Sequence, residues 1–389
     1  MSQRADPDLL FELKKYGAVN IESCFNCGTC TAICPLTTDE HPFPRNMVRM
    51  VQLGLKDRLM ESTDPWLCYY CGECTETCPR EAEPAETMMS LRRWLTAQYD
   101  PSGHAAKLYT SEKAVAMTII RASLLTLAFF VVLHLLNIAS VVTDKVELNA
   151  FAPVMWVWGF VLLHFAYLGI KVVRNTLHMT NLVMRSSVKD GKIPISVYIS
   201  ELKILVINLA TQKRWRDCGG ENRWWLRHLL LLSGYATMLV LVVVLLPLFQ
   251  TDNIYPIYNP QRWLGYYATV VLIYISIDML IFRRRKEDEM HRFSQPSDWL
   301  FPLFLLVGAV TGILVNIFRY LGADNAVWAW PTYIIYLIHV MAMIAMLDTE
   351  VGIGKWMHLI YRPWAMYLEA VKVKAAEKES AAGALAPAD

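Results

Sequence analysis

The chain has 389 residues, of which 55% are hydrophobic and 19% charged, and its formal net charge is +2. Several apolar runs exceed the roughly 18 residues that a bilayer-crossing helix needs, so the composition excludes an ordinary soluble enzyme and indicates a membrane protein. A near-neutral charge gives no support for nucleic-acid binding, because membrane topology explains the basic loops. We expect an all-α protein.

Two copies of one cysteine run lie in the first hundred residues. Each copy has three cysteines with two residues between them and a fourth before a proline; the eight are Cys24, Cys27, Cys30, Cys34, Cys68, Cys71, Cys74 and Cys78. This is the ligand pattern of two 4Fe-4S clusters, in which the fourth cysteine of each run binds the cluster of the other run. The expected sets are Cys24, Cys27, Cys30 and Cys78, and Cys68, Cys71, Cys74 and Cys34. Zinc is the alternative, because cysteines at this spacing also form tetrahedral zinc sites.

Helices are expected around these runs. Apolar positions recur at helical spacing over residues 43–60, and a helix opened by Pro84, with Glu86 in its first turn, follows the second run. With the cysteines, residues 15–100 resemble the helical ferredoxin module of succinate dehydrogenase iron-sulfur subunits and of the small iron-sulfur subunit of heterodisulfide reductase. We therefore expect residues 1–105 to form a helical ferredoxin domain with two 4Fe-4S clusters.

Six apolar segments are long enough to cross a bilayer. They are residues 115–142, 153–173, 229–249, 263–282, 299–321 and 329–350. Residues 110–365 are expected to form a transmembrane bundle, and residues 366–389, rich in Ala, Lys and Glu, a flexible tail. Residues 195–209 mix apolar residues with Glu201 and Lys203, which predicts an amphipathic helix on the membrane surface.

The distribution of basic residues predicts the orientation. The loops after the second and fourth spans are basic, and the second of them contains four consecutive cations at positions 283–286. The positive-inside rule places both loops, the cluster domain and the carboxy-terminal tail in the cytoplasm. The first hundred residues carry no apolar leader and no twin arginine, so export of this part is not expected. A crossing by residues 195–209 is the alternative, and it would turn residues 283–286 outward. We expect a multi-pass protein of the cytoplasmic (inner) membrane.

Six of the nine histidines lie in or beside the spans. Three are expected near mid-bilayer: His134, His164 and His339. The other three are expected at the cytoplasmic ends of the spans: His178, His228 and His358. Ionisable groups inside a membrane are costly and are functional candidates by default. Two layers of imidazoles fit two stacked b haems with axial nitrogen ligands. For each histidine alone, the alternative is a hydrogen-bonded core residue.

Residues 222–238, 281–312 and 337–368 resemble the cytochrome b family that includes the gamma subunit of respiratory nitrate reductase and the membrane subunit of heterodisulfide reductase. The resemblance implies that His228, at the start of the third span, and His358, on the last span, hold the cytoplasmic-side haem. It also implies that His339 ligates a deeper haem.

One departure from that family leaves the second ligand of the deeper haem open. Where the family has another histidine on the third span, this chain has Met238. The partner of His339 is therefore His164, which we favour because a histidine avoids thioether ligation, or His134 or Met238. A rival scheme pairs His164 and His178, fourteen residues apart on one helical face, with His339 and His358.

Nearly the whole chain resembles the QmoC family, the cytochrome b-type membrane component of the quinone-interacting membrane-bound oxidoreductases (Qmo) of sulfate reducers. The resemblance implies menaquinol as donor, two flavin- and iron-sulfur-containing cytoplasmic subunits of the Qmo A and B type as partners, and adenylylsulfate reductase as downstream acceptor. The expected function is electron transfer from menaquinol through two b haems and two 4Fe-4S clusters. The alternatives are a fused membrane subunit of a heterodisulfide reductase-like complex and a non-redox, zinc-binding membrane scaffold.

No catalytic residue is assigned. The chain has no GxGxxG after a strand and no Walker motif, so flavin chemistry is expected in partner chains. Candidates for quinone contact are Arg319, Tyr320 and Asp324 at the outer end of the fifth span and Tyr266 in the fourth, although interfacial anchoring explains them better. Cys218 has no partner at motif spacing and is expected to be a free thiol.

Overall fold

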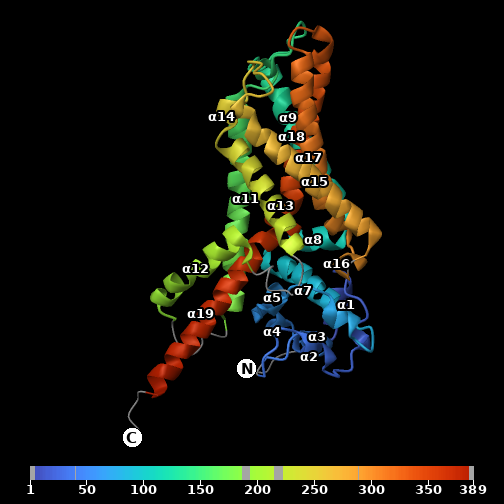
Figure 1. Ribbon diagram of the computed structural model, residues 1–389, viewed down its shortest axis with the longest axis vertical. Coiled ribbons are helices and arrows are strands. Elements are labelled where there is room, and N and C mark those ends of the chain that lie inside the picture. The colour runs from blue at the N-terminus through green and yellow to red at the C-terminus, as the bar shows by residue number, and fades with distance from the viewer. Residues whose placement is uncertain (1–4, 40, 186–192, 214–221, 288, 385–389) are drawn as a thin grey trace.

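The computed structural model describes residues 5–39, 41–185, 193–213, 222–287 and 289–384 (Figure 1). These ranges contain helices and no β-strand, which confirms the all-α class. The α-helices are α1 (Leu9–Lys14), α2 (Thr29–Ile33), α3 (Arg45–Gln52), α4 (Lys56–Glu61), α5 (Asp64–Leu67), α6 (Glu73–Glu76), α7 (Pro84–Tyr99), α8 (His104–Thr110), α9 (Glu112–Leu135), α10 (Leu148–Phe151), α11 (Val154–Val183), α12 (Ile195–Thr211), α13 (Asn222–Val243), α14 (Leu246–Phe249), α15 (Trp263–Arg285), α16 (Glu289–Arg292), α17 (Pro296–Leu321), α18 (Ala329–Glu350) and α19 (His358–Ala384).

The cysteine-bearing part consists of the short helices α1 to α6 around the longer helix α7. As the sequence predicts, α7 begins at Pro84, whose missing N–H costs nothing in the first turn. Met88, Leu91 and Leu95 lie on one face of α7 and are fully buried, because they recur at the spacing of a single helical face. Helix α7 packs against α1, α3 and α5, and these contacts hold the helices that carry the cysteine loops together.

Six helices are long and apolar enough to span a membrane, which confirms the predicted number: α9, α11, α13, α15, α17 and α18. Neighbours pack in the order α9, α18, α17, α15, α13 and α11 (Figure 1). The predicted first span, 115–142, ran too far, since α9 ends at Leu135 and Asn137 adopts a left-handed conformation with φ of 57°. The second span continues past 173 to Val183.

The last span, α18, has the predicted bounds, Ala329–Glu350, and therefore ends before His358. We expected His358 on it, but α18 ends at Glu350 and His358 opens the separate helix α19. The break falls at Gly352, whose φ of 86° favours glycine, because a side chain there is strained. The expected flexible tail from 366 is also wrong in its first part, since α19 continues to Ala384 and both Leu368 and Val371 are fully buried.

The segment expected as a surface helix forms α12, outside the six candidate spans. It packs along α19, and Lys374 Nζ lies 2.5 Å from Glu201 Oε1 between the two helices. Ile199 and Val206, on its other side, are exposed. Figure 1 shows α12 and the end of α19 projecting together from the bundle.

The apolar core of the cysteine-bearing part extends into α12, α19 and the end of α11, whereas the membrane helices pack around a second apolar core. The Tyr361 ring of α19 lies 5.4 Å from the Trp66 ring and 5.3 Å from the Tyr99 ring. Arg174 on α11 forms an ion pair with Asp100 at 2.8 Å. Contacts between large aromatic rings are worth about 0.5–1.5 kcal/mol each beyond their burial, so the two parts are held as one body.

Candidate functional site

The two cysteine runs have matching backbones. Gly28 and Gly72 follow the second cysteine of each run and adopt φ angles of 95° and 91°, which reverse the chain into α2 and α6. A residue with a Cβ atom is strained in this left-handed conformation, so glycine is the residue that fits. Since α2 and α6 pack against each other, the two loops face the same region.

The cysteine thiols fall into two neighbouring groups. Burial raises the pKa of Cys30, and the nearby thiols of Cys24, Cys27 and Cys78 raise it further. Burial also raises the pKa of Cys34 to about 11, with smaller contributions from thiols that include Cys68 and Cys71. The fourth cysteine of each run therefore lies near the other run. These are the members of the two predicted sets, and the ligand assignment itself stays a prediction.

The second set surrounds a definite space. Cys34, Cys68, Cys71 and Cys74 line a cavity of about 360 Å³, closed on other sides by apolar side chains that include Phe43. No three Cys, His, Asp or Glu side chains of the described residues converge closely enough to hold a single metal ion. A 4Fe-4S cube is larger than one ion and holds its thiolates farther apart. The cavity fits such a group in donor type and in number of thiols.

His228 and His358 face each other near the base of the bundle. Their ring centroids are 6.1 Å apart and their planes are inclined by 75°. Two metal–nitrogen bonds of about 2 Å plus the two ring radii give roughly 6 Å, so one metal ion fits between the rings. His358 Nδ1 lies 2.7 Å from the Lys355 carbonyl oxygen, which can only accept, so Nδ1 donates and Nε2 is left as the ligand atom.

The cavity beside these histidines has the mixed lining that a haem requires. Apolar and aromatic side chains, among them Leu231, Ile275, Phe301 and Trp356, provide most of its walls. Lys355 and five arginines also line it: Arg92, Arg93, Arg227, Arg283 and Arg362. Guanidinium groups form charge-assisted hydrogen bonds with carboxylates such as those of haem. The residues present therefore fit a haem.

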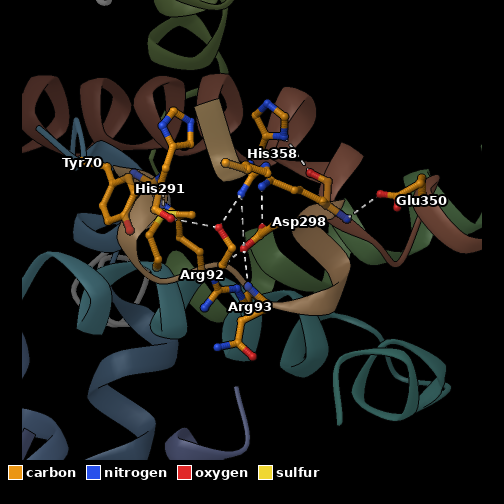
Figure 2. A network of polar contacts seen from close by, with 12 residues as sticks. Tyr70, Arg92, Arg93, His291, Asp298, Glu350 and His358 are labelled. Carbon is orange, nitrogen blue, oxygen red and sulfur yellow. Dashed lines mark hydrogen bonds and ion pairs between the residues drawn. The ribbon is translucent and has the colours of Figure 1, made fainter. Parts of the chain in front are cut away.

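A buried polar network joins this cavity to the second cysteine run, and we call it the interface network (Figure 2). Its centre is Asp298, which lies 2.5 Å from Lys355 Nζ and 3.2 Å from Arg93 Nη2. Arg93 Nη1 donates to Glu86 at 2.8 Å, and the Tyr70 hydroxyl donates to the other Glu86 oxygen at 2.7 Å. Through the Lys355 carbonyl the interface network ends on His358 Nδ1, so it runs from a cysteine loop to a candidate metal ligand.

Sequence reasoning missed the interface network. The one readable signal was Gln295, which with Asp298 forms a capping box at the start of α17. Nothing in the sequence links Asp298 to Arg93, 205 residues away.

His339 lies in a second cavity, of about 360 Å³, between α13, α15, α17 and α18. Its Nδ1 is 2.9 Å from Thr311 Oγ1, and that hydroxyl already donates to the Val307 carbonyl at 2.6 Å. Thr311 therefore accepts from His339 Nδ1, and Nε2 is free to bind a metal. A Cβ atom on Gly312 would lie 3.3 Å from His339 Cε1, so glycine leaves the ring room.

The candidate partners of His339 are placed differently. Met238 lines the same cavity as His339. His164, which we favoured, instead faces Asp348 on α18, with Nε2 3.3 Å from Oδ1. His134 lies in the last turn of α9, not at mid-depth, because that helix ends seven residues earlier than expected, and its Nδ1 donates to the Phe130 carbonyl. His178 lies on α11 and lines neither cavity.

The candidates for quinone contact lie near the start of α15 and the end of α17, away from the cysteine loops. Arg319 and Tyr266 line the His339 cavity. The Tyr320 hydroxyl donates to the Tyr255 carbonyl, and Asp324 is exposed outside the cavity lining. Cys218, expected as a free thiol, lies outside the described residues.

The fold and the cysteine loops define an iron-sulfur membrane protein. Residues 20–82 match a family model described as 4Fe-4S dicluster domain. The chain thus carries an amino-terminal 4Fe-4S dicluster domain joined to six helices that suggest a multi-pass membrane protein. The match favours iron-sulfur clusters over the zinc interpretation.

Relatives of this domain are iron-sulfur subunits of heterodisulfide reductases, of the type designated C. A protein of Archaeoglobus profundus named as similar to this C-type subunit is 36% identical over 88 residues, 22% of this chain and 47% of that protein. The C-type iron-sulfur subunit of the CoB–CoM heterodisulfide reductase of Methanopyrus kandleri is 32% identical over 124 residues, 30% of this chain and 61% of that protein. The chain thus spans about half the length of these relatives. No solved structure matches it.

Proposed function

We propose that the chain is the membrane electron-transfer subunit of a quinone-linked oxidoreductase. In this proposal menaquinol is the donor, two b haems and two 4Fe-4S clusters are the resident cofactors, and flavin- and iron-sulfur-containing subunits of the Qmo A and B type are the cytoplasmic partners. Adenylylsulfate reductase is the proposed final acceptor. The proposed location is the cytoplasmic membrane, with the cluster domain and the carboxy-terminal tail on the cytoplasmic side.

The observation that carries the proposal is the adjacency of two cofactor-type sites. The cavity of Cys34, Cys68, Cys71 and Cys74 and the cavity of His228 and His358 share residues of their walls. When bound, haems and 4Fe-4S clusters each take up and release one electron at a time. The chain's own part is to hold, orient and insulate such groups, which fits an electron-transfer role.

Each histidine site is prepared for a neutral imidazole ligand. Burial lowers the pKa of His358 to about 3, so its ring is uncharged, as metal ligation requires. The Lys355 carbonyl fixes the ring orientation at this site, and Thr311 fixes that of His339. We propose Met238 as the second ligand of the haem held by His339. Met238 and His339 line the same cavity, whereas His164 and His134 do not line it.

A related candidate function is a fused membrane subunit of a heterodisulfide reductase-like complex. The similarity of the dicluster domain to the C-type iron-sulfur subunits of heterodisulfide reductases favours it. The two proposals share the cofactors and differ in the acceptor. Reduction of purified adenylylsulfate reductase or of a heterodisulfide-reducing partner by the menaquinol-reduced chain separates them.

The first test is the dithionite-reduced minus oxidised spectrum of the purified chain, with a pyridine haemochrome count and iron analysis. We expect two b haems and about eight non-haem irons per chain. His358→Ala should remove one haem, whereas His178→Ala, whose histidine lines neither cavity, should retain both. A colourless chain with stoichiometric zinc would refute the proposal.

A further inference from the structure

Two consecutive tyrosines separate the two neighbouring cavities. Tyr69 and Tyr70 line the cavity of the second cysteine set, and they also line the cavity of His228 and His358. They lie between Cys68 and Cys71, so the second run itself forms part of the wall beside the histidines. Residues 24–34, which contain the first run, contribute nothing to the lining of the histidine cavity.

The interface network connects the tyrosine wall to the histidine cavity. It begins at the Tyr70 hydroxyl and ends at His358 Nδ1, with every intermediate step a hydrogen bond or ion pair between buried or half-buried groups. Arg92 also holds the cysteine loop in place, because its guanidinium donates to the carbonyls of Pro65 and Cys68. The cysteine loop therefore cannot move away from the histidine cavity without breaking buried polar contacts.

The start of the first cysteine run, unlike Cys34 at its end, lies on the side of the dicluster domain away from the histidine cavity. Phe25, next to Cys24, is 60% exposed, and Arg80 stacks over its ring at 5.7 Å. Figure 1 places α2, which follows Cys27, at the end of the domain away from the membrane helices, whereas α5, which precedes Cys68, packs on α19.

We propose that Cys34, Cys68, Cys71 and Cys74 form the inner site, which exchanges electrons directly with the group held by His228 and His358. Cys24, Cys27, Cys30 and Cys78 then form the outer site, from which electrons leave for a partner. The inference rests on the proposed function. In the step from the histidine site to the inner site, a ferrous haem loses one electron and becomes ferric. The cluster of the inner site gains that electron, and no bond forms or breaks.

A matched pair of variants of the full-length chain tests the order. Cys71→Ser and Cys27→Ser alter the same position of each run, and both cysteines are exposed. Coulombic interaction falls with distance, so loss of the inner cluster perturbs the nearer haem more. A potentiometric titration of the haem α-band should show a shifted midpoint potential in Cys71→Ser and an unchanged one in Cys27→Ser. A shift in Cys27→Ser alone, equal shifts, or no shift in either variant would overturn the inference.

Rapid mixing gives a second readout. After reduction of the haems by a menaquinol analogue, Cys27→Ser should still reduce its remaining cluster at the unmodified rate, whereas Cys71→Ser should reduce its remaining cluster at least tenfold more slowly. EPR and iron analysis identify the cluster that remains. Cys74→Ser and Cys30→Ser repeat the comparison if a variant does not assemble. Absence of haem in the unmodified chain would refute the proposed function itself, whereas a reversed order with haem present refutes only this inference.

Discussion

Replacing Asp298 with asparagine tests how much the interface network stabilises the chain. Asp298 is 4% exposed and neutralises charge from Lys355 at 2.5 Å, Arg93 at 3.2 Å and Arg283 at 3.9 Å. Removing one partner of a buried ion pair costs about 3–5 kcal/mol, because it leaves buried charge uncompensated. Arg93 keeps Glu86 at 2.8 Å and Lys355 is partly exposed, so we expect the lower end, about 3 kcal/mol.

The assay is thermal unfolding of the full-length chain in detergent, followed by intrinsic fluorescence at a fixed scan rate. At about 2 °C per kcal/mol, the lower end for large domains, Asp298→Asn should lower the apparent Tm by about 6 °C. Glu22→Gln is the matched control, since its pair with Lys14 at 2.7 Å is about half exposed and is worth less than about 1 kcal/mol. Equal shifts in both variants, or an unchanged Tm in Asp298→Asn, would refute the reasoning and mean that desolvation cancels the network's attraction.

Two further predictions concern the deeper histidine. Thr311→Val removes the hydroxyl that orients His339, and loss of such an outer partner should weaken haem binding about 10–100-fold, measured by haem retention during dilution. Gly312→Val crowds the same ring, because even a Cβ atom there lies 3.3 Å from it, and should lower haem content. Gly159→Val, at a position with open space, is the control and should keep full content; equal losses would mean that the substitutions act on the bundle as a whole.

The sequence predicted features that depend on local spacing. The cysteine runs predicted the dicluster domain, and six apolar runs predicted six membrane-spanning helices. Each of these patterns is contained in a few dozen consecutive residues. The pairing of His228 with His358 was predicted from a family resemblance and not from local spacing, since the two residues lie 130 positions apart and on separate helices. His358 was placed on the wrong helix because the break at Gly352 depends on a backbone angle that an apolar pattern does not reveal.

Long-range contacts were beyond prediction. The Asp298 carboxylate meets residues 205 and 57 positions away, and no periodicity connects them. His164 was favoured because a histidine avoids thioether ligation and because its depth fits, about 15 Å from the start of α11 at 1.5 Å per residue. Depth does not determine the direction of a side chain, and in the structure this ring faces Asp348.

The turn between α18 and α19 makes the two histidine sites mechanically independent. On one unbroken helix His339 and His358 would be 19 residues apart on a stiff rod, and any tilt would move both. Here the rod ends at Glu350, and each imidazole is adjusted by its own neighbours, Thr311 for one and Lys355 for the other. If the two sites hold haems as proposed, substitutions beside one histidine can therefore change the redox potential at that site and leave the other unchanged.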